Sequence, residues 1–133
     1  MPHDLIINML DSLIVTWGGL LEFNGVIVVT TDTVPGYRIR EIKGIARDGV
    51  VRATHIGRDI VATIRNIVGG EVKEYTQLLA EAREEALKRM VQSAKAMGAN
   101  AVVGVRFSTA MIGSRIAEIF AYGTAVVVEK VEE

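Results

Sequence analysis

Apolar residues recur at helical spacing in the central part of the chain. Between Glu71 and Met97 they return every three or four positions and form one continuous face. Residues 58–68 carry a second, shorter apolar stripe, which Gly69-Gly70 ends because glycine tolerates the left-handed cap position. The pattern therefore predicts two consecutive helices, with Gly98 closing the longer one.

Runs rich in β-branched residues flank the helical region and predict strands. Val26–Thr31 precedes Pro35-Gly36, a pair that fits the central positions of a type II turn. Tyr37–Ala46 predicts a second strand, and Val50–Thr54 continues it after a turn at Asp48-Gly49. Its isoleucines fall three residues apart, at positions 39, 42 and 45, which strict alternation forbids. A β-bulge near position 41 or 44 would reconcile that spacing with a strand.

Two further strands are predicted after the helices, over Ala101–Ala110 and Ile116–Lys130. The last strand has one side of small and apolar residues, which lets a helix approach closely, and an opposite side that is also apolar. The predicted fold is α+β: two layers, with an antiparallel sheet packed against helices in the order β-β-α-α-β-β. Because helices cover only one face, the second face requires another copy of the chain or the N-terminal segment, and another copy is favoured.

The N-terminal segment allows two interpretations. Apolar residues from Ile6 to Leu21 follow helical spacing, but the run Leu13–Trp17 fits a strand equally well. The segment is too short and too polar for a membrane span. The first basic residue is Arg38, so the positive region of a signal peptide is missing.

Charge and cysteine content narrow the classes of function. Lys and Arg total 15 against 16 Asp and Glu, so the chain lacks the excess of basic residues that is typical of nucleic-acid-binding proteins. Nucleic acid is therefore not expected as a partner. The chain has no cysteine, which excludes disulfides and thiolate metal sites and suits a cytoplasmic protein.

Several segments in a fixed order resemble the YbjQ-like family of uncharacterised proteins. They are Thr31–Tyr37, Gly57–Ile60, Arg65 with Gly69–Glu71 and Tyr75, Ala82–Ala86 with Met90, Gly98–Val102 and Ala121–Ala125. The resemblance implies a two-layer α+β fold, a ring-shaped homo-oligomer with five subunits, and a heavy-metal-binding label without an assigned biochemical function. It divides the chain into an N-terminal extension over residues 1–25 and a single domain over residues 26–133.

Five residues are candidate ligand-binding residues. Asp32 and Thr33 either form an oxygen-rich cation site or fix the adjacent turn through backbone hydrogen bonds. Arg83 on the inward line of the long helix, and Arg106 in a valine-rich strand, each call for an acidic partner such as Glu41 or Glu118, or for an anion. Tyr37 could line a pocket or simply pack at the edge of the core.

The donor set does not favour a heavy-metal site within one subunit. Soft metals prefer thiolate or imidazole ligands, and only His3 and His55 are present, without paired spacing. No catalytic group or cofactor is identified. We therefore expect a non-catalytic, ring-forming protein that binds a small ligand or ion between subunits. The alternatives are an enzyme with an interfacial site built from Asp32, Tyr37, Glu41 or Arg83, and an oligomeric interaction scaffold.

Overall fold

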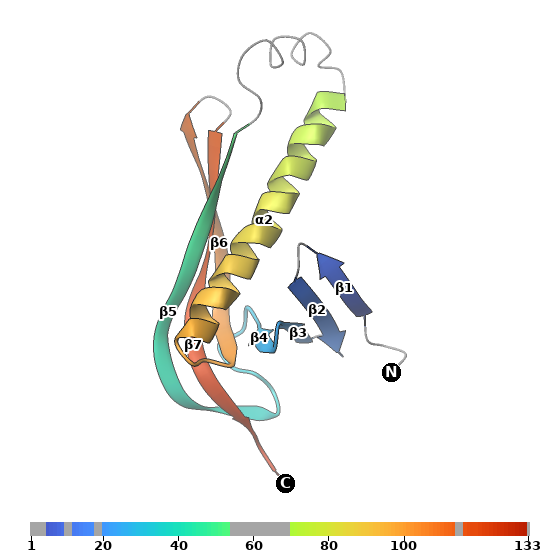
Figure 1. Cartoon of the computed structure of the whole chain (residues 1–133). Helices are drawn as coiled ribbons and strands as arrows, with labels where there is room; N and C mark the ends of the chain where they lie inside the picture. The colour runs from blue at the N-terminus through green and yellow to red at the C-terminus, as the bar shows by residue number, and fades with distance from the viewer. Residues whose placement is uncertain (1–4, 10–11, 18–19, 54–69, 114–115, 133) are drawn as a thin grey trace.

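The computed structural model describes residues 5–9, 12–17, 20–53, 70–113 and 116–132. Within these ranges it contains seven strands and one helix (Figure 1). The elements are β1 (Leu5–Met9), β2 (Ser12–Trp17), β3 (Leu20–Phe23), β4 (Val26–Val28), β5 (Tyr37–Ala53), α2 (Gly70–Ala96), β6 (Ala101–Gly113) and β7 (Ile116–Lys130). All strands belong to one sheet in the order β1-β2-β3-β4-β6-β7-β5.

The α+β class is confirmed, and the predicted antiparallel sheet is corrected to a mixed one. The pairing of β4 with β6 is parallel while the other pairings are antiparallel, so the sheet is mixed. A single helix is found in the part of the chain that the structure describes, so the two-helix order is not matched. The helix predicted over residues 58–68 lies outside the described residues.

The N-terminal segment forms strands, so the helical interpretation was wrong and the strand interpretation of Leu13–Trp17 was right. A tight turn explains this outcome locally. Asn24 and Gly25 have φ of 52° and 84°, as a type I′ hairpin requires, and they pair Phe23 with Val26. Phe23 is 1% exposed in the main core. In Figure 1, β1 and β2 lie on the side of α2 that is away from the long strands.

Strand β5 is one uninterrupted element, so the turn predicted at Asp48-Gly49 does not form. Both residues instead pair with β7, opposite Ala121 and Phe120. The predicted β-bulge is confirmed at both sites proposed for it, because the register shifts between Ile39 and Glu41 and again between Ile42 and Gly44. The two bulges bring the three isoleucines of β5 onto one face of the sheet.

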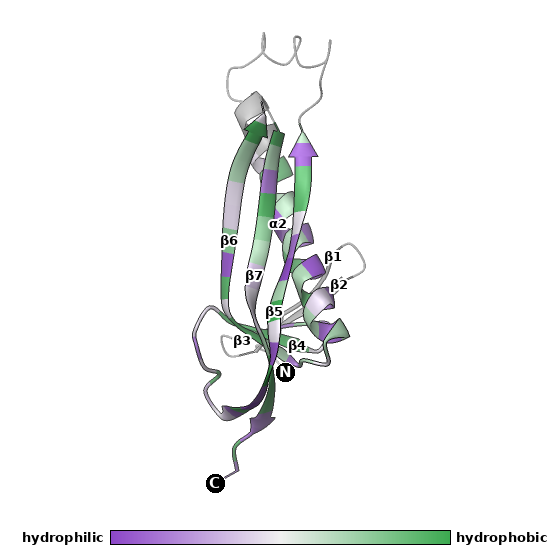
Figure 2. Cartoon of the chain, turned by 90° about the vertical axis from the view of Figure 1, so that its left-hand side faces the viewer, coloured by the Kyte–Doolittle hydropathy of each residue, from purple (hydrophilic) through white to green (hydrophobic). Residues whose placement is uncertain are grey.

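Helix α2 covers one face of the long strands, called the inner face, and the opposite face is called the outer face (Figures 1 and 2). The predicted long helix is confirmed, and half of its buried core residues are alanines: the six are Ala82, Ala86, Leu87, Met90, Val91 and Ala94. The helix ends at Ala96, and Gly98, two residues later, has φ of 86°. Gly98 N donates to Lys95 O and Ala99 N to Ala94 O, the paired bonds of a Schellman motif.

The inner face of β7 carries small residues, and close contacts with β6 explain one of them, Gly123. Gly123 lies on the inner face beside Val102 and Val105 of β6. A Cβ at this position would lie 2.7 Å from Val102 Cγ1 and 3.0 Å from the Val103 carbonyl oxygen. Real Cβ contacts of this length do not occur, and Val102 is fully buried, so it has little room to move.

We predict that Gly123→Ala lowers the free energy of unfolding by about 1–3 kcal/mol, the usual cost of overpacking a core. Chemical denaturation measures it. Gly113→Ala is the matched control, because its Cβ would meet only the flexible side chain of Ile116, at 3.3 Å. Equal stability of the two variants would contradict this account of Gly123.

Candidate functional site

The loop of residues 29–36 covers one end of the outer face. Its central residue, Val34, is 2% exposed and packs with Val103, Val126 and Val128. The predicted type II turn is confirmed, since Tyr37 N donates to Val34 O at 3.0 Å and Gly36 has φ of 85°. The turn therefore connects the loop, which packs on the sheet through Val34, to the start of β5.

Arg106 anchors this loop to β6. Its Nη1 donates to the carbonyl oxygens of Thr30 at 3.0 Å and Val105 at 2.8 Å. Two backbone bonds support the same contact, from Gly104 N to Thr31 O and from Val105 N to Val29 O. The described acceptors of Arg106 are carbonyl oxygens and none is a carboxylate, so the acidic partner or anion expected for it stays a prediction.

Asp32 and Thr33 lie at the exposed tip of the same loop. The hydrogen bond that closes the tip comes from their neighbour, since Thr31 Oγ1 donates to Thr33 O at 2.6 Å. Asp32 Oδ1 lies beside Gly104, 4.0 Å from the position of a Cβ built there. The side chain that fixes the turn is therefore that of Thr31, and the Asp32 carboxylate has no described hydrogen-bond or ion-pair partner.

The candidate residues are divided between two layers. Tyr37 is half-buried against the cluster under the loop, so it lies at the same end of the sheet as Asp32, Thr33 and Arg106. Arg83 lies on α2, in the other layer. One chain therefore brings four of the five residues to one end and leaves Arg83 apart.

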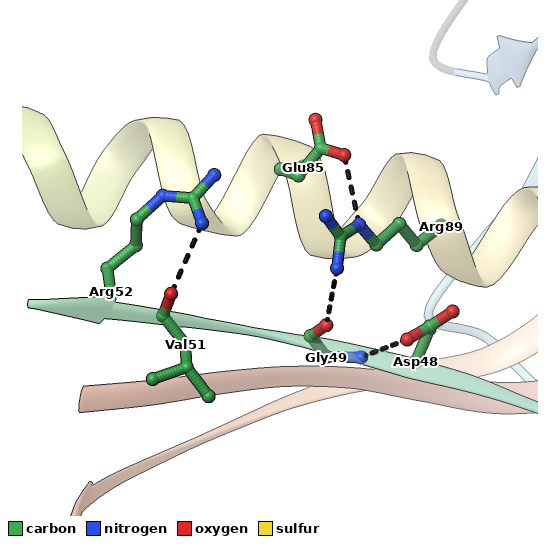
Figure 3. Close-up of polar contacts among 6 residues, drawn as sticks. All are labelled: Asp48, Gly49, Val51, Arg52, Glu85 and Arg89. Atoms are coloured by element: carbon green, nitrogen blue, oxygen red, sulfur yellow. Dashed lines mark hydrogen bonds and ion pairs between the residues drawn. The ribbon is translucent and has the colours of Figure 1, made fainter. Parts of the chain in front are cut away.

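Arg83 was expected to face inward, but its side chain is exposed. The arginine that joins α2 to the sheet is Arg89, about one and two-thirds turns further along (Figure 3). Its Nε donates to Glu85 at 3.0 Å and its Nη1 to the Gly49 carbonyl oxygen at 3.2 Å. Glu41, proposed as a partner of Arg83, instead pairs with Lys43 at 3.0 Å.

The remainder of the outer face exposes several large apolar side chains. Figure 2 views the three long strands from this side and shows hydrophobic stretches between hydrophilic ones. The three isoleucines of β5 that the bulges align are 39%, 69% and 65% exposed, in the order Ile39, Ile42 and Ile45. Val51 and Tyr122 extend the same surface, and Phe120 stacks beside Tyr122 with ring centroids 6.1 Å apart. The sequence-based expectation of a second apolar face is thus confirmed, and the described part of the chain leaves most of it uncovered.

Sequence reasoning missed one polar residue that holds the end of the sheet together. The Asn100 side chain accepts from Val128 N at 2.8 Å and donates to Val128 O at 3.0 Å, which replaces a strand neighbour for β7 at this point. An amide supplies one donor and one acceptor, so it can imitate a backbone pair. The sequence did offer one indication of this role: Asn100 lies between the glycine that caps α2 and the first residue of β6.

Comparison with known proteins finds similarity over the part of the chain from β4 to β7. A family model described as "Putative heavy-metal-binding" matches residues 26–129. A UPF0145 protein of Thermococcus kodakarensis is 70% identical over 108 residues, covering 81% of this chain and 96% of the relative. UPF0145 proteins of Pyrococcus abyssi and Thermotoga maritima are 68% and 51% identical, covering 82% and 79% of this chain and 96% and 99% of theirs. Strands β1–β3 precede the family match.

A solved structure of a protein of unknown function from Pediococcus pentosaceus is 15% identical and covers 79% of this chain and 99% of its own, with a TM-score of 0.49. No helix in the described residues is long and apolar enough to cross a membrane.

The residues present do not fit a soft heavy metal. The chain has no cysteine, and both histidines lie outside the described residues. Across the described ranges, no three His, Asp or Glu side chains gather in a group that could hold a metal ion. Soft cations need thiolate or imidazole ligands, and the described residues offer no such donor set for the family's label.

We predict that Arg106→Ala loosens the loop of residues 29–36, because two charge-assisted hydrogen bonds to carbonyl oxygens are lost. The backbone amides of Gly104 and Val105, which donate to this loop, should exchange about tenfold faster in hydrogen–deuterium exchange. Arg83→Ala is the control and should leave their exchange unchanged. Unaltered exchange in the Arg106 variant would show that the guanidinium does not hold the loop.

Proposed function

The chain belongs to the YbjQ-like UPF0145 family, and from this premise we propose that it is a non-catalytic subunit of a homo-oligomeric ring that binds a small ligand between subunits. The family resemblance favours five subunits. The observation that carries the proposal is the exposed outer face of β5, β6 and β7.

The exposed apolar area supports burial by a second copy. Ile42 and Ile45 alone are about two-thirds exposed, and full burial of such a side chain contributes about 1.5–3 kcal/mol. Scattered exposed apolar residues need no explanation, but these lie side by side on one sheet face. The N-terminal strands, the other cover considered, extend the sheet from β4 and lie toward α2 (Figure 1).

Two open strand edges indicate how copies could join. Strand β5 is the last strand of the sheet, and β6 pairs with β4 only at Ala101 and Val102. An open, partly apolar edge is a template for pairing with another chain. Two β5 edges would set basic residues against each other, since β5 carries Arg38, Arg40, Lys43, Arg47 and Arg52 against two acidic residues. Pairing of β5 with β6 of another copy avoids that repulsion.

Joining two different edges of the same subunit is a heterologous contact, which generates a ring when the rotation closes. In this arrangement the loop carrying Asp32 and Thr33, with Tyr37 and Arg106 beside it, lies next to the β6 edge. A ligand held there would contact two copies. Arg83, on α2, could join such a site only from a neighbouring subunit, and no described contact favours an enzymatic site.

We predict that Ile45→Lys shifts the protein from an assembly to smaller species, because it places a charge in the apolar centre of the outer face. Sedimentation velocity over a range of concentrations measures this. Val131→Lys is the matched control, because it adds the same charge at an exposed residue beyond the end of β7. A wild-type monomer, or an Ile45→Lys assembly of wild-type size, would contradict the proposal.

A further inference from the structure

Three hydrogen-bond donors form a row across the outer face. Tyr122 on β7 pairs directly with Arg47 on β5 and with Arg106 on β6. Directly opposed residues share a face, with Cβ atoms about 5 Å apart, so the two arginine Cβ atoms lie about 10 Å apart across Tyr122. The Arg47 side chain is long enough to carry its guanidinium over the Tyr122 ring, whereas the Arg106 guanidinium is held beside it, at the carbonyl oxygens of Thr30 and Val105.

The donors in this row are mostly unused. Within the described ranges, Arg47 has no hydrogen-bond or ion-pair partner, and neither does the Tyr122 hydroxyl. Arg106 uses Nη1 for the carbonyl oxygens of Thr30 and Val105, which fixes its position and leaves its remaining N–H groups without described acceptors. One cation of the row is thus held in place by the loop, and the other is free.

The carboxylates near the row do not neutralise it. Glu118 shares the outer face but lies four residues along β7, which is about 13 Å in a strand. Asp32 lies beside Gly104, and it forms no ion pair with Arg106. The row is therefore a local positive site within a face that is otherwise largely apolar.

Covering this face changes the energetics of the row. A second copy would remove water from the two guanidinium groups, and an unpaired buried charge is strongly destabilising. Guanidinium groups are best satisfied by carboxylate or phosphate oxygens, which accept two parallel hydrogen bonds. A metal cation would be repelled at the same place.

We propose that Arg47, Tyr122 and Arg106 bind an oxyanion, a phosphate or carboxylate group, on the outer face between subunits. The location between subunits rests on the proposed assembly, whereas the chemistry of the row does not. The oxyanion is either a free small molecule or a carboxylate of the neighbouring copy, and both sources present the same acceptor geometry.

The test compares Arg47→Gln with Arg83→Gln, an exposed arginine in the other layer. Arg47 is chosen because it has no described structural bond, whereas Arg106 holds the loop; thermal unfolding verifies that both variants fold. Inorganic phosphate is titrated calorimetrically into each protein in phosphate-free buffer, with cadmium chloride as the metal probe. Sedimentation velocity of the same samples gives the self-association constant.

A free oxyanion predicts saturable phosphate binding that Arg47→Gln weakens about tenfold and Arg83→Gln leaves intact. A carboxylate from the neighbouring copy predicts instead that Arg47→Gln weakens self-association about tenfold while phosphate has no effect. Either result supports the site. The proposal is overturned if Arg47→Gln alters neither measurement, or if Arg47→Gln leaves self-association unchanged and cadmium binds saturably while phosphate does not. A monomer whose phosphate binding depends on Arg47 would refute the assembly and leave the site standing.

Discussion

Strand β7 is apolar on both faces, and one helix covers only one of them. The inner face of β7 is built from Ala117, Ile119, Ala121, Gly123 and Ala125, and α2 packs its alanines against it. Because these side chains are small, the helix and sheet approach closely and the contact leaves little room for substitution. Among the described residues, no comparable layer covers the outer face. The loop around Val34 closes one end, and the rest of the face exposes apolar side chains to water.

The two bulges of β5 follow from the same constraint. Isoleucines spaced three apart would alternate between faces in a regular strand, and the register shifts at Glu41 and Gly44 return all three to the outer face. The bulges therefore gather three large apolar side chains on one face, which is expected when that face is buried by a partner. The same surface carries the two arginines and the tyrosine of one row, and guanidinium donors favour an anion over the soft metal of the family's description.

Much of the fold was predictable because local signals agreed with tertiary contacts. The 3.6-residue period of α2, its glycine cap, the Pro35-Gly36 turn and the strand β7 all matched, since burial follows directly from each pattern. The turn expected at Asp48-Gly49 failed because pairing with β7 along the whole strand outweighs a local turn preference. The sequence did not show which of Arg83 and Arg89 would contact the sheet. Both lie at the edge of the apolar face of α2, and helical spacing does not say which part of that edge lies over β5. Parallel pairing of β4 with β6 is a long-range contact without a local signal.

The central claim is that the outer face of the sheet is covered by another copy in solution. Photochemical carbene labelling, read by mass spectrometry, measures solvent exposure of side chains directly. If the claim is right, Ile42, Ile45 and Tyr122 will be labelled weakly in the native protein, compared with exposed residues of α2 such as Ala96. Labelling of these residues in proportion to their exposure in the single chain, 69%, 65% and 39%, would contradict it.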